Sequence, residues 1–148
     1  MALESSLWQK VRKGGVALKL LGHEVHLRRL ENSVGTGDPD VNGCINGPHT
    51  FDIELKSEPR PARASTPIRP KVKPSQSIWH RDRTEAGCKT HWVLIQVGDA
   101  AQAKLYLIPG RMYDHITAPE DDLELMSVLD SPTLPMTKVL LRAREGWQ

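Results

Sequence analysis

The chain is poor in cysteine: its 148 residues include only Cys44 and Cys88, which lie far apart. Because they form no Cys-x-x-Cys pair, neither a disulfide framework nor a zinc site is indicated, and a reduced intracellular setting is expected. Long hydrophobic runs are also absent. No apolar stretch is long enough to span a membrane, and Glu4 interrupts any signal-peptide pattern near the N-terminus. These absences predict a cytoplasmic protein without a membrane partner.

Charge of one sign and internal repeats are lacking as well. Lysine plus arginine number 20 and aspartate plus glutamate 18, which leaves a formal net charge of +2. So small an excess is compatible with nucleic-acid binding but does not argue for it. The glycine-rich residues 32–37 lack the GxxxxGK[ST] pattern, which excludes a nucleotide-binding P-loop. The length predicts one domain that buries about two-thirds of its unfolded surface.

What the sequence does contain is a stretch with the pattern of a β-hairpin. Residues 52–56, Asp-Ile-Glu-Leu-Lys, alternate polar and apolar side chains, as a half-buried strand does. Glu54 and Lys56 therefore share one face, while the apolar side chains point into a core. An upstream apolar run covers residues 41–45, and the intervening Asn-Gly-Pro-His at residues 46–49 favours a turn.

The turn between these two runs determines which residues face each other. It pairs Ile45 with Thr50, so that paired residue numbers sum to about 95, within one or two. Asp40 then lies opposite Glu54 or its neighbour, at a Cβ separation of roughly 4.5–5.5 Å. Two carboxylates this close repel unless a cation lies between them, and a divalent ion with oxygen ligands suits the position. Lys56 would then contact a phosphate or orient a water. The alternative is a surface hairpin with an ordinary pattern of charges.

The order and spacing of these residues resemble the PD-(D/E)XK nuclease signature. The matching segments are residues 37–41 (Gly-Asp-Pro-Asp-Val) and 51–56 (Phe-Asp-Ile-Glu-Leu-Lys), with Glu4 in a first helix and Gln76 opening a later one. The chain is most similar to the VRR-NUC-like branch and its small phage-encoded relatives, over roughly residues 3 to 108. The resemblance implies an α/β fold with a restriction-endonuclease-like core, in the order αβββαβ, whose mixed sheet is flanked by helices.

The same resemblance implies an activity and its residues. The expected activity is Mg²⁺- or Mn²⁺-dependent endonucleolytic hydrolysis of DNA, selective for branched, junction or flap structures. The resemblance implies that the catalytic side chains are those of Asp40, Glu54, Lys56, Gln76 and Glu4. The metal would be held by Asp40, Glu54 and the backbone carbonyl of Leu55. Gln76 departs from the family pattern, because no further acid or lysine follows it closely. A junction-cutting enzyme would act as a homodimer, and a phage-encoded one in the cytoplasm of a bacterial host cell.

Some assignments have alternatives. Glu4 would also stabilise the positive end of a helix dipole if it lies in the first turn. Asp38 is a rival to Asp40 as a metal ligand, although the hairpin register and the resemblance both favour Asp40. Asp52 shares the face of Glu54 and is a candidate to support the site.

A second feature is the basic, proline-rich segment at residues 57–75, which cannot build a core and is expected to be an irregular loop. Because it directly follows the proposed catalytic strand, we expect it to contact the phosphate backbone of DNA. The predicted nucleic-acid contacts, one of them on the following helix, are Arg60, Arg63, Arg69, Lys71, Lys73 and Arg83. The alternatives are a solvated linker and, for the whole chain, a non-catalytic nucleic-acid-binding module.

Hydrophobic periodicity predicts the remaining elements. A helix is expected over residues 3–21, with an end or kink at Gly14-Gly15. Residues 23–30, 92–97 and 103–108 are expected to be strands.

A second helix is expected over residues 75–86, capped by Ser75, ended by Gly87 and carrying His80 on its surface. Residues 1–110 would form the nuclease-like core and residues 111–148 an extension packed on the same domain. In this extension we expect a helix near 121–129 and a helix or edge strand near 138–144.

Overall fold

The computed structural model describes residues 2–30 and 37–148, and for residues 2–5 it describes the backbone only. In chain order the elements are α1 (Ala2–Leu20), β1 (Val25–Arg29), β2 (Val41–Ile45), β3 (Thr50–Glu58), α2 (Pro74–Glu85), β4 (His91–Val97), η1 (Ala100–Gln102), β5 (Lys104–Pro109), η2 (Gly110–His115), α3 (Glu120–Met126) and α4 (Met136–Glu145). The two η elements are 3₁₀-helices. Most of the glycine-rich loop predicted at residues 32–37 lies outside the described residues.

The strands form one mixed sheet in the order β1-β2-β3-β4-β5. Only the β3–β4 pair is parallel, whereas the other three pairs are antiparallel. A parallel pair requires a crossover connection, and here it consists of residues 59–73 followed by α2. The element order from α1 to β4 is αβββαβ, so this part of the prediction is confirmed.

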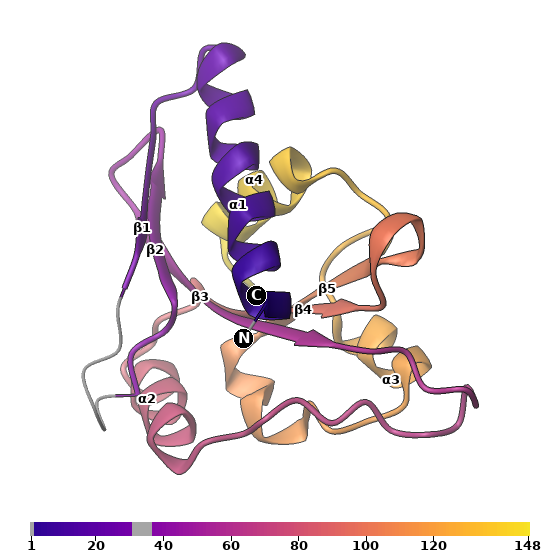
Figure 1. Ribbon diagram of the computed structural model, residues 1–148. Helices are drawn as coiled ribbons and strands as arrows, with labels where there is room; N and C mark the ends of the chain where they lie inside the picture. Colours follow the sequence, from indigo (N-terminus) through magenta and orange to yellow (C-terminus); the bar gives the residue numbers. More distant parts are fainter. Residues whose placement is uncertain (1, 31–36) are drawn as a thin grey trace.

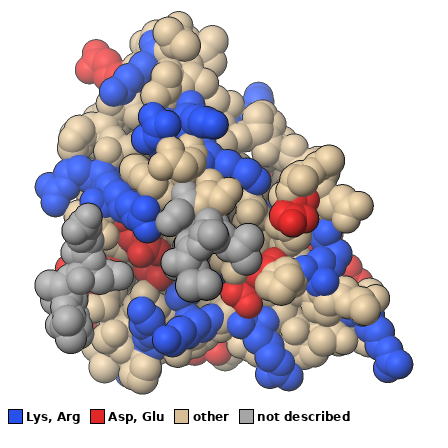
Figure 2. All heavy atoms as spheres, viewed as in Figure 1, with Lys and Arg blue, Asp and Glu red and all other residues tan. Residues whose placement is uncertain are grey.

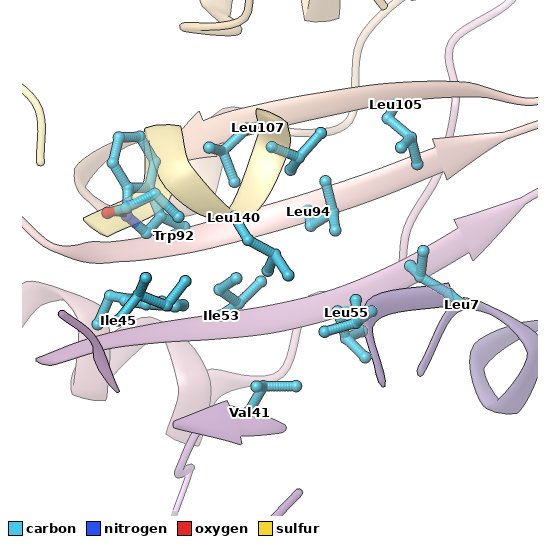
Figure 3. Close-up of a cluster of buried hydrophobic side chains, with 14 of the residues drawn as sticks. Leu7, Val41, Ile45, Ile53, Leu55, Trp92, Leu94, Leu105, Leu107 and Leu140 are labelled. Atoms are coloured by element: carbon cyan, nitrogen blue, oxygen red, sulfur yellow. Dashed lines mark hydrogen bonds between the residues drawn. The ribbon is translucent and has the colours of Figure 1, made fainter. Parts of the chain in front are cut away.

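Helices cover both faces of the sheet (Figure 1). On one face, α1 and α4 pack over apolar side chains of β2 to β5. Figure 3 shows Leu140 of α4 close to Ile53 and Leu94, which belong to the same buried cluster. On the opposite face, η2 and α3 enclose a second cluster, which also includes Ile68 of the crossover segment.

The crossover segment and α2 explain why β3 departs from the expected half-buried strand. The predicted alternation is correct, because Ile53 and Leu55 lie in the first apolar cluster while Glu54 and Lys56 point the other way. However, Glu54 is only 2% exposed and Lys56 only 3%. The strand is therefore buried on both faces. Periodicity along β3 could not reveal this, since α2 is supplied by a later part of the chain.

The β2–β3 register agrees with the prediction within its stated range. Val41 pairs with Ile53 and Cys44 with Thr50, so the paired numbers sum to 94. Cys44, and not Ile45, pairs with Thr50, so the register differs by one residue from the predicted pairing, while Ile45 pairs with Val25 of β1. Continuing the register by one residue places Asp40 opposite Glu54.

The first helix continues through Gly14 and Gly15, so the expected end or kink is wrong. Both glycines are buried at close contacts. A Cβ on Gly14 would lie 2.7 Å from the Cγ of Met136, and one on Gly15 would lie 2.7 Å from a methyl carbon of Leu27. Because these glycines have no side chains, α4 and β1 can approach α1 closely. This packing offsets the low helix propensity of glycine.

The remaining helices agree with the prediction in place but differ at one cap. In α2, Lys73 is the N-cap residue and makes no side-chain capping bond, so the predicted cap at Ser75 is wrong. Pro74 begins the helix, which suits a residue without a backbone N–H. Gly87 follows the C-cap with a φ of +90°, as expected. Residues 136–145 form a helix and not an edge strand. No helix within the described ranges is both long and apolar enough to cross a membrane.

Candidate active site

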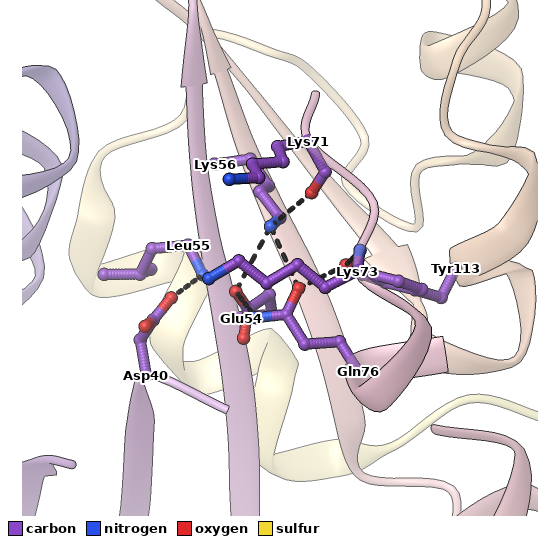
Figure 4. Close-up of polar contacts among 8 residues, drawn as sticks. All are labelled: Asp40, Glu54, Leu55, Lys56, Lys71, Lys73, Gln76 and Tyr113. Atoms are coloured by element: carbon purple, nitrogen blue, oxygen red, sulfur yellow. Dashed lines mark hydrogen bonds and ion pairs between the residues drawn. The ribbon is translucent and has the colours of Figure 1, made fainter. Parts of the chain in front are cut away.

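The structure brings four of the predicted site residues together at the β2–β3 edge (Figure 4). Asp40 directly precedes β2, Glu54 and Lys56 extend from β3, and Gln76 lies in the first turn of α2. One carboxylate oxygen of Asp40, Oδ2, accepts a hydrogen bond of 2.8 Å from the backbone amide of Leu55. This bond holds Asp40 against the segment that carries Glu54 and Lys56.

The two carboxylate oxygens of Glu54 have different surroundings. Oε2 accepts a hydrogen bond of 2.7 Å from Nε2 of Gln76 and lies 3.4 Å from Nζ of Lys56. Oε1 is buried and has no hydrogen-bond partner among the residues that the structure describes. An unpaired buried carboxylate oxygen is costly, so this atom marks a position where a cation or a donor is expected.

The charge balance at the site leads to the same expectation. Burial, together with the nearby carboxylate of Asp40, raises the pKa of Glu54 to about 8, while Lys56 acts to lower it. Two carboxylates therefore lie near a single ammonium group. Its attraction does not offset the effect of burial, which disfavours the ionised form of Glu54. A divalent cation would stabilise both carboxylates in their ionised form.

The donor atoms fit a hard divalent cation. The ladder between β2 and β3 ends at the Val41–Ile53 pair, so the amide of Leu55 turns to Asp40 and not to a strand. In an extended strand the N–H and C=O of one residue point to the same side, which directs the Leu55 carbonyl to this edge too. Carboxylate and carbonyl oxygens are the ligands that Mg²⁺ and Mn²⁺ prefer.

The described part of the chain contains no cluster of three or more His, Cys, Asp or Glu side chains that would hold a metal. An ion at this edge would therefore have two carboxylates, one backbone carbonyl and water as ligands. Mg²⁺ commonly retains several waters and takes only one or two carboxylates from a protein. The donor set is thus compatible with Mg²⁺ without a third acidic side chain.

Lys56 has an acceptor for each of its three N–H groups. Its Nζ atom lies 2.7 Å from the backbone oxygen of Lys71, 3.1 Å from Oε1 of Gln76 and 3.4 Å from Oε2 of Glu54. The contact with Lys71 fastens the crossover segment over β3. A phosphate or water can reach the ammonium only by replacing one of these acceptors.

His80 is buried in α2, so its prediction as a surface histidine is wrong. Its ring stacks between His91 and Tyr113, and its Nδ1 lies 2.8 Å from Nδ1 of His91. Burial, reinforced for His80 by the charge of His91, lowers the pKa of His80 to about 3, and burial lowers that of His91 to about 4. Both rings are therefore neutral near pH 7, and neither acts as a general acid there. Gly110 makes room for this pair.

Tyr113, which reaches the site from η2, is not among the predicted site residues. Its hydroxyl donates to Oε1 of Gln76 and accepts from the backbone amide of Lys73, at 3.4 Å. Tyr113 follows β5, outside the region of the family resemblance. No local pattern in the sequence could have associated it with Glu54, because the contact depends on how η2 packs against α2.

The predicted nucleic-acid contacts differ in their surroundings. All five cations of the crossover segment are exposed: Arg60, Arg63, Arg69, Lys71 and Lys73. Arg83 is also exposed and lies over the ring of Trp79, at 4.7 Å from its centroid. Arg60, by contrast, binds both carboxylate oxygens of Glu120 at 2.8 and 3.0 Å and donates to the carbonyls of Gln102 and Val97. These contacts join the segment to α3 and β4, and the expected DNA contact of Arg60 stays a prediction.

Three further acids have less direct relations to the site. The side chain of Glu4 lies outside the described residues, although its backbone belongs to α1. Asp38 is half-buried. Asp52 accepts a hydrogen bond of 3.0 Å from Asn42, and burial raises the pKa of its carboxyl group. On the face shown in Figure 2, acidic atoms lie between groups of lysine and arginine side chains.

Nine chains of solved structures match this fold. One is Hjc, a Holliday junction resolvase from the archaeal hyperthermophile Archaeoglobus fulgidus. The match has a TM-score of 0.52 and 15% sequence identity, and it covers 93% of this chain and 97% of that chain. The α/β fold with a restriction-endonuclease-like core is thereby confirmed. No family model and no curated protein matches the chain. The VRR-NUC-like branch and a phage origin therefore stay predictions.

Proposed function

We propose that the chain is a divalent-metal-dependent DNA endonuclease that acts on branched DNA. The observation that carries the proposal is the buried carboxylate of Glu54 beside the carboxylate of Asp40 and the ammonium of Lys56. Its Oε1 has no hydrogen-bond partner in the described part of the chain. A carboxylate pair and an amine at one sheet edge are the groups that metal-assisted phosphodiester hydrolysis requires.

Each group has a definite role in this proposal. Asp40, Glu54 and the Leu55 carbonyl would hold Mg²⁺ or Mn²⁺, which when bound lowers the pKa of a water ligand and polarises a phosphate oxygen. Lys56 places its positive charge beside the same carboxylates. There it stabilises the negative charge that develops on the phosphate during attack. Gln76 donates a hydrogen bond to Oε2 of Glu54, so that Oε1 remains available to a metal ion.

Access to the site requires a local rearrangement. Glu54 and Lys56 are buried, whereas Asp40 is half-buried, so a phosphate enters from the side of Asp40. The Lys71 carbonyl is the acceptor on Lys56 that belongs to the irregular crossover segment, and it is the one that a phosphate oxygen replaces. Backbone atoms of this segment move more easily than groups fastened in the sheet or in α2.

The selectivity for branched DNA is supported by the fold shared with a Holliday junction resolvase. A four-way junction presents two related strands, and two copies of one active site in a symmetric dimer would cut both. Exposed cations of the crossover segment, with Arg83, would contact phosphates on either side of the cleaved bond.

A cleavage assay tests the proposal. Purified protein is incubated with a four-way junction, a flap, a linear duplex and a single strand, each with Mg²⁺ or Mn²⁺. We expect the branched substrates to be cut, and Asp40→Asn or Lys56→Ala to reduce the rate at least about 100-fold. The matched controls Asp99→Asn and Lys104→Ala change exposed residues of the same types and should cut at the wild-type rate.

Two outcomes would contradict the proposal. Cleavage at the wild-type rate by Asp40→Asn and Lys56→Ala would remove the assigned site. Tight binding of the junction without cleavage in either metal would instead assign the chain the role of a non-catalytic nucleic-acid-binding module. Gel filtration with light scattering, with and without the junction, determines whether the active species is a dimer.

A further inference from the structure

Tyr113 belongs to η2 yet contacts the centre of the candidate site. Its side chain is buried, and its ring stacks on that of His80 with 4.8 Å between centroids and 21° between planes. The ring also lies beside Lys56, whose Nζ is 5.9 Å from its centroid. These contacts fix the position of the phenol ring independently of its hydroxyl group.

The hydroxyl group is the middle of a directed chain of hydrogen bonds. The backbone amide of Lys73 can only donate, so the Tyr113 oxygen accepts from it. The single proton of the hydroxyl is then directed to Oε1 of Gln76. Nε2 of Gln76 in turn donates to Oε2 of Glu54, at 2.7 Å. Each of these three hydrogen bonds therefore has one defined donor and one defined acceptor.

This chain determines which way the Gln76 amide is turned. Its oxygen faces two donors, the Tyr113 hydroxyl and the Lys56 ammonium, and its NH₂ group faces a carboxylate. Turning the amide by 180° would place the NH₂ group against the ammonium and the oxygen against Glu54. The contact with the ammonium would then be repulsive, and so would the contact with Glu54 whenever its carboxylate is ionised. Tyr113 and Lys56 together therefore favour a single orientation.

We propose that Tyr113 is a positioning residue of the candidate active site, and this inference rests on the proposed nuclease function. Through Gln76 it keeps Oε2 of Glu54 hydrogen-bonded and leaves Oε1 as the oxygen that receives the metal ion. Without the hydroxyl, Gln76 loses one of the two donors that orient it. The Glu54 carboxylate is then free to rotate, and its metal-binding oxygen is no longer held in one place.

Tyr113→Phe tests the inference, because it removes the hydroxyl and keeps the ring that stacks on His80. The matched control is Tyr106→Phe, which removes the hydroxyl of another buried tyrosine, bonded at 2.6 Å to Glu120 and not to Gln76. We expect Tyr113→Phe to lower kcat about tenfold, the effect of one buried hydrogen bond, with little change in KM for DNA. The Mn²⁺ concentration for half-maximal rate should rise by a similar factor. Tyr106→Phe should alter neither quantity.

A double-mutant cycle separates positioning from general support of the fold. If Tyr113 acts through Gln76, Tyr113→Phe should have no further effect on kcat in a Gln76→Ala background. Additive effects of the two substitutions would overturn the inference. Equal kcat and metal dependence for Tyr113→Phe and Tyr106→Phe would also overturn it.

A readout without cleavage keeps this inference distinct from the proposed function. In a ¹⁵N spectrum of the metal-free protein, the side-chain NH₂ signals of Gln76 should exchange with solvent about ten times faster in Tyr113→Phe than in the wild type or in Tyr106→Phe. Unchanged exchange would overturn the positioning role even if the enzyme cuts DNA. Failure of the wild type to cut any substrate would contradict the nuclease function, while the exchange measurement still decides whether Tyr113 orients Gln76.

Discussion

The ammonium of Lys56 donates a hydrogen bond of 2.7 Å to the backbone carbonyl of Lys71. Through this contact the irregular crossover segment, residues 59–73, reaches the buried strand that carries the candidate site. The same lysine also contacts Gln76 and Glu54, so its charge is already shared among three oxygen atoms. Substrate binding at this site therefore has to change a contact that also holds the crossover segment in place.

The first prediction concerns that segment. When a phosphate replaces the Lys71 carbonyl, the backbone around residues 71–73 loses a contact and its amides exchange faster. Hydrogen–deuterium exchange with and without a four-way junction measures this, in metal-free buffer that prevents turnover under the proposed mechanism. A peptide from α4 is the control, since this helix packs on the opposite face of the sheet from the segment. Slower or equal exchange at residues 71–73 in the bound state would contradict the prediction.

The second prediction concerns metal binding without DNA. Glu54→Gln keeps the shape of the side chain and an acceptor for Gln76 but removes the charge that would hold a cation. At a Mn²⁺ concentration 100 times Kd, binding stabilises the folded state by about 2.7 kcal/mol, so the Tm of the wild type should rise by several degrees. The Tm of Glu54→Gln should not change with Mn²⁺, whereas Asp99→Asn should respond as the wild type does. Differential scanning calorimetry checks each variant, and an equal response of Glu54→Gln would argue against the site.

The third prediction concerns acid stability. The pKa values of His80 and His91 are lowered to about 3 and about 4 in the folded state, mainly by burial, from an ordinary value of 6.5. Above pH 6.5 both rings are neutral in the folded and the unfolded state, so they do not change the free energy of unfolding. Below pH 6.5 the unfolded chain takes up protons that the folded chain refuses, so the contribution of this pair to the free energy of unfolding falls as pH decreases toward 4. Glu54, whose pKa is raised to about 8, contributes in the opposite direction, so the pair is isolated by comparison with variants.

Urea unfolding at pH 7, 6, 5 and 4 measures that loss, which should reach a few kcal/mol. His80→Gln removes one of the two titrating rings, so its stability should depend less steeply on pH over this range. His49→Gln removes an exposed histidine and is the matched control, with the wild-type dependence expected. A pH dependence of His80→Gln as steep as that of the wild type would show that the buried pair is not its source.

The fourth prediction separates structural from DNA-binding arginines. Arg60→Ala removes the contacts with Glu120 and two carbonyls, and should lower the free energy of unfolding by about 1–2 kcal/mol. It should leave the salt dependence of junction binding unchanged. Arg63→Ala and Arg69→Ala should each reduce the slope of log K against log salt by about 0.9 and leave stability unchanged. Fluorescence anisotropy at several salt concentrations gives the slopes, and an altered slope for Arg60→Ala would return that residue to the DNA contacts.

The fifth prediction tests the packing of α1 against α4. In Gly14→Ala the new Cβ would lie 2.7 Å from the Cγ of Met136, so either the Met136 side chain or one of the two helices has to shift. Overpacking of this kind costs about 1–3 kcal/mol, more than the helix propensity gained from alanine. Lys13→Ala changes the exposed neighbouring residue and should be neutral or slightly stabilising. Thermal unfolding of both variants gives the comparison, and a stabilised Gly14→Ala would contradict the close contact.

Several features of the site could be predicted because they depend on residues close in sequence. The alternation along residues 52–56 assigned Glu54 and Lys56 to one face, and the turn chemistry placed Asp40 opposite Glu54 within one residue. Both inferences follow from the two-residue period of a strand and the geometry of a short connection. The order of the helices and strands followed from the same local periodicities.

Other features could not be read from local patterns because they depend on segments that meet only in the folded molecule. His80 was predicted to lie on the surface, because no pattern in the neighbouring sequence indicates that η2 and β4 enclose its ring. The ion pair between Arg60 and Glu120 of α3 could not be predicted either, because the two residues are 60 positions apart in the sequence. The glycines of α1 suggested a break, whereas they serve close packing against α4 and β1.

The sequence alone determined which side chains could form the site, because the strand period and the turn decide which residues share a face and which residues pair. Tertiary structure decided the environment of those side chains: α2 and the crossover segment bury Glu54 and Lys56, and η2 brings Tyr113 to Gln76. The physical reason is that pairing within a hairpin is a local property of the chain. Burial and charge balance, in contrast, depend on every element that packs against the hairpin.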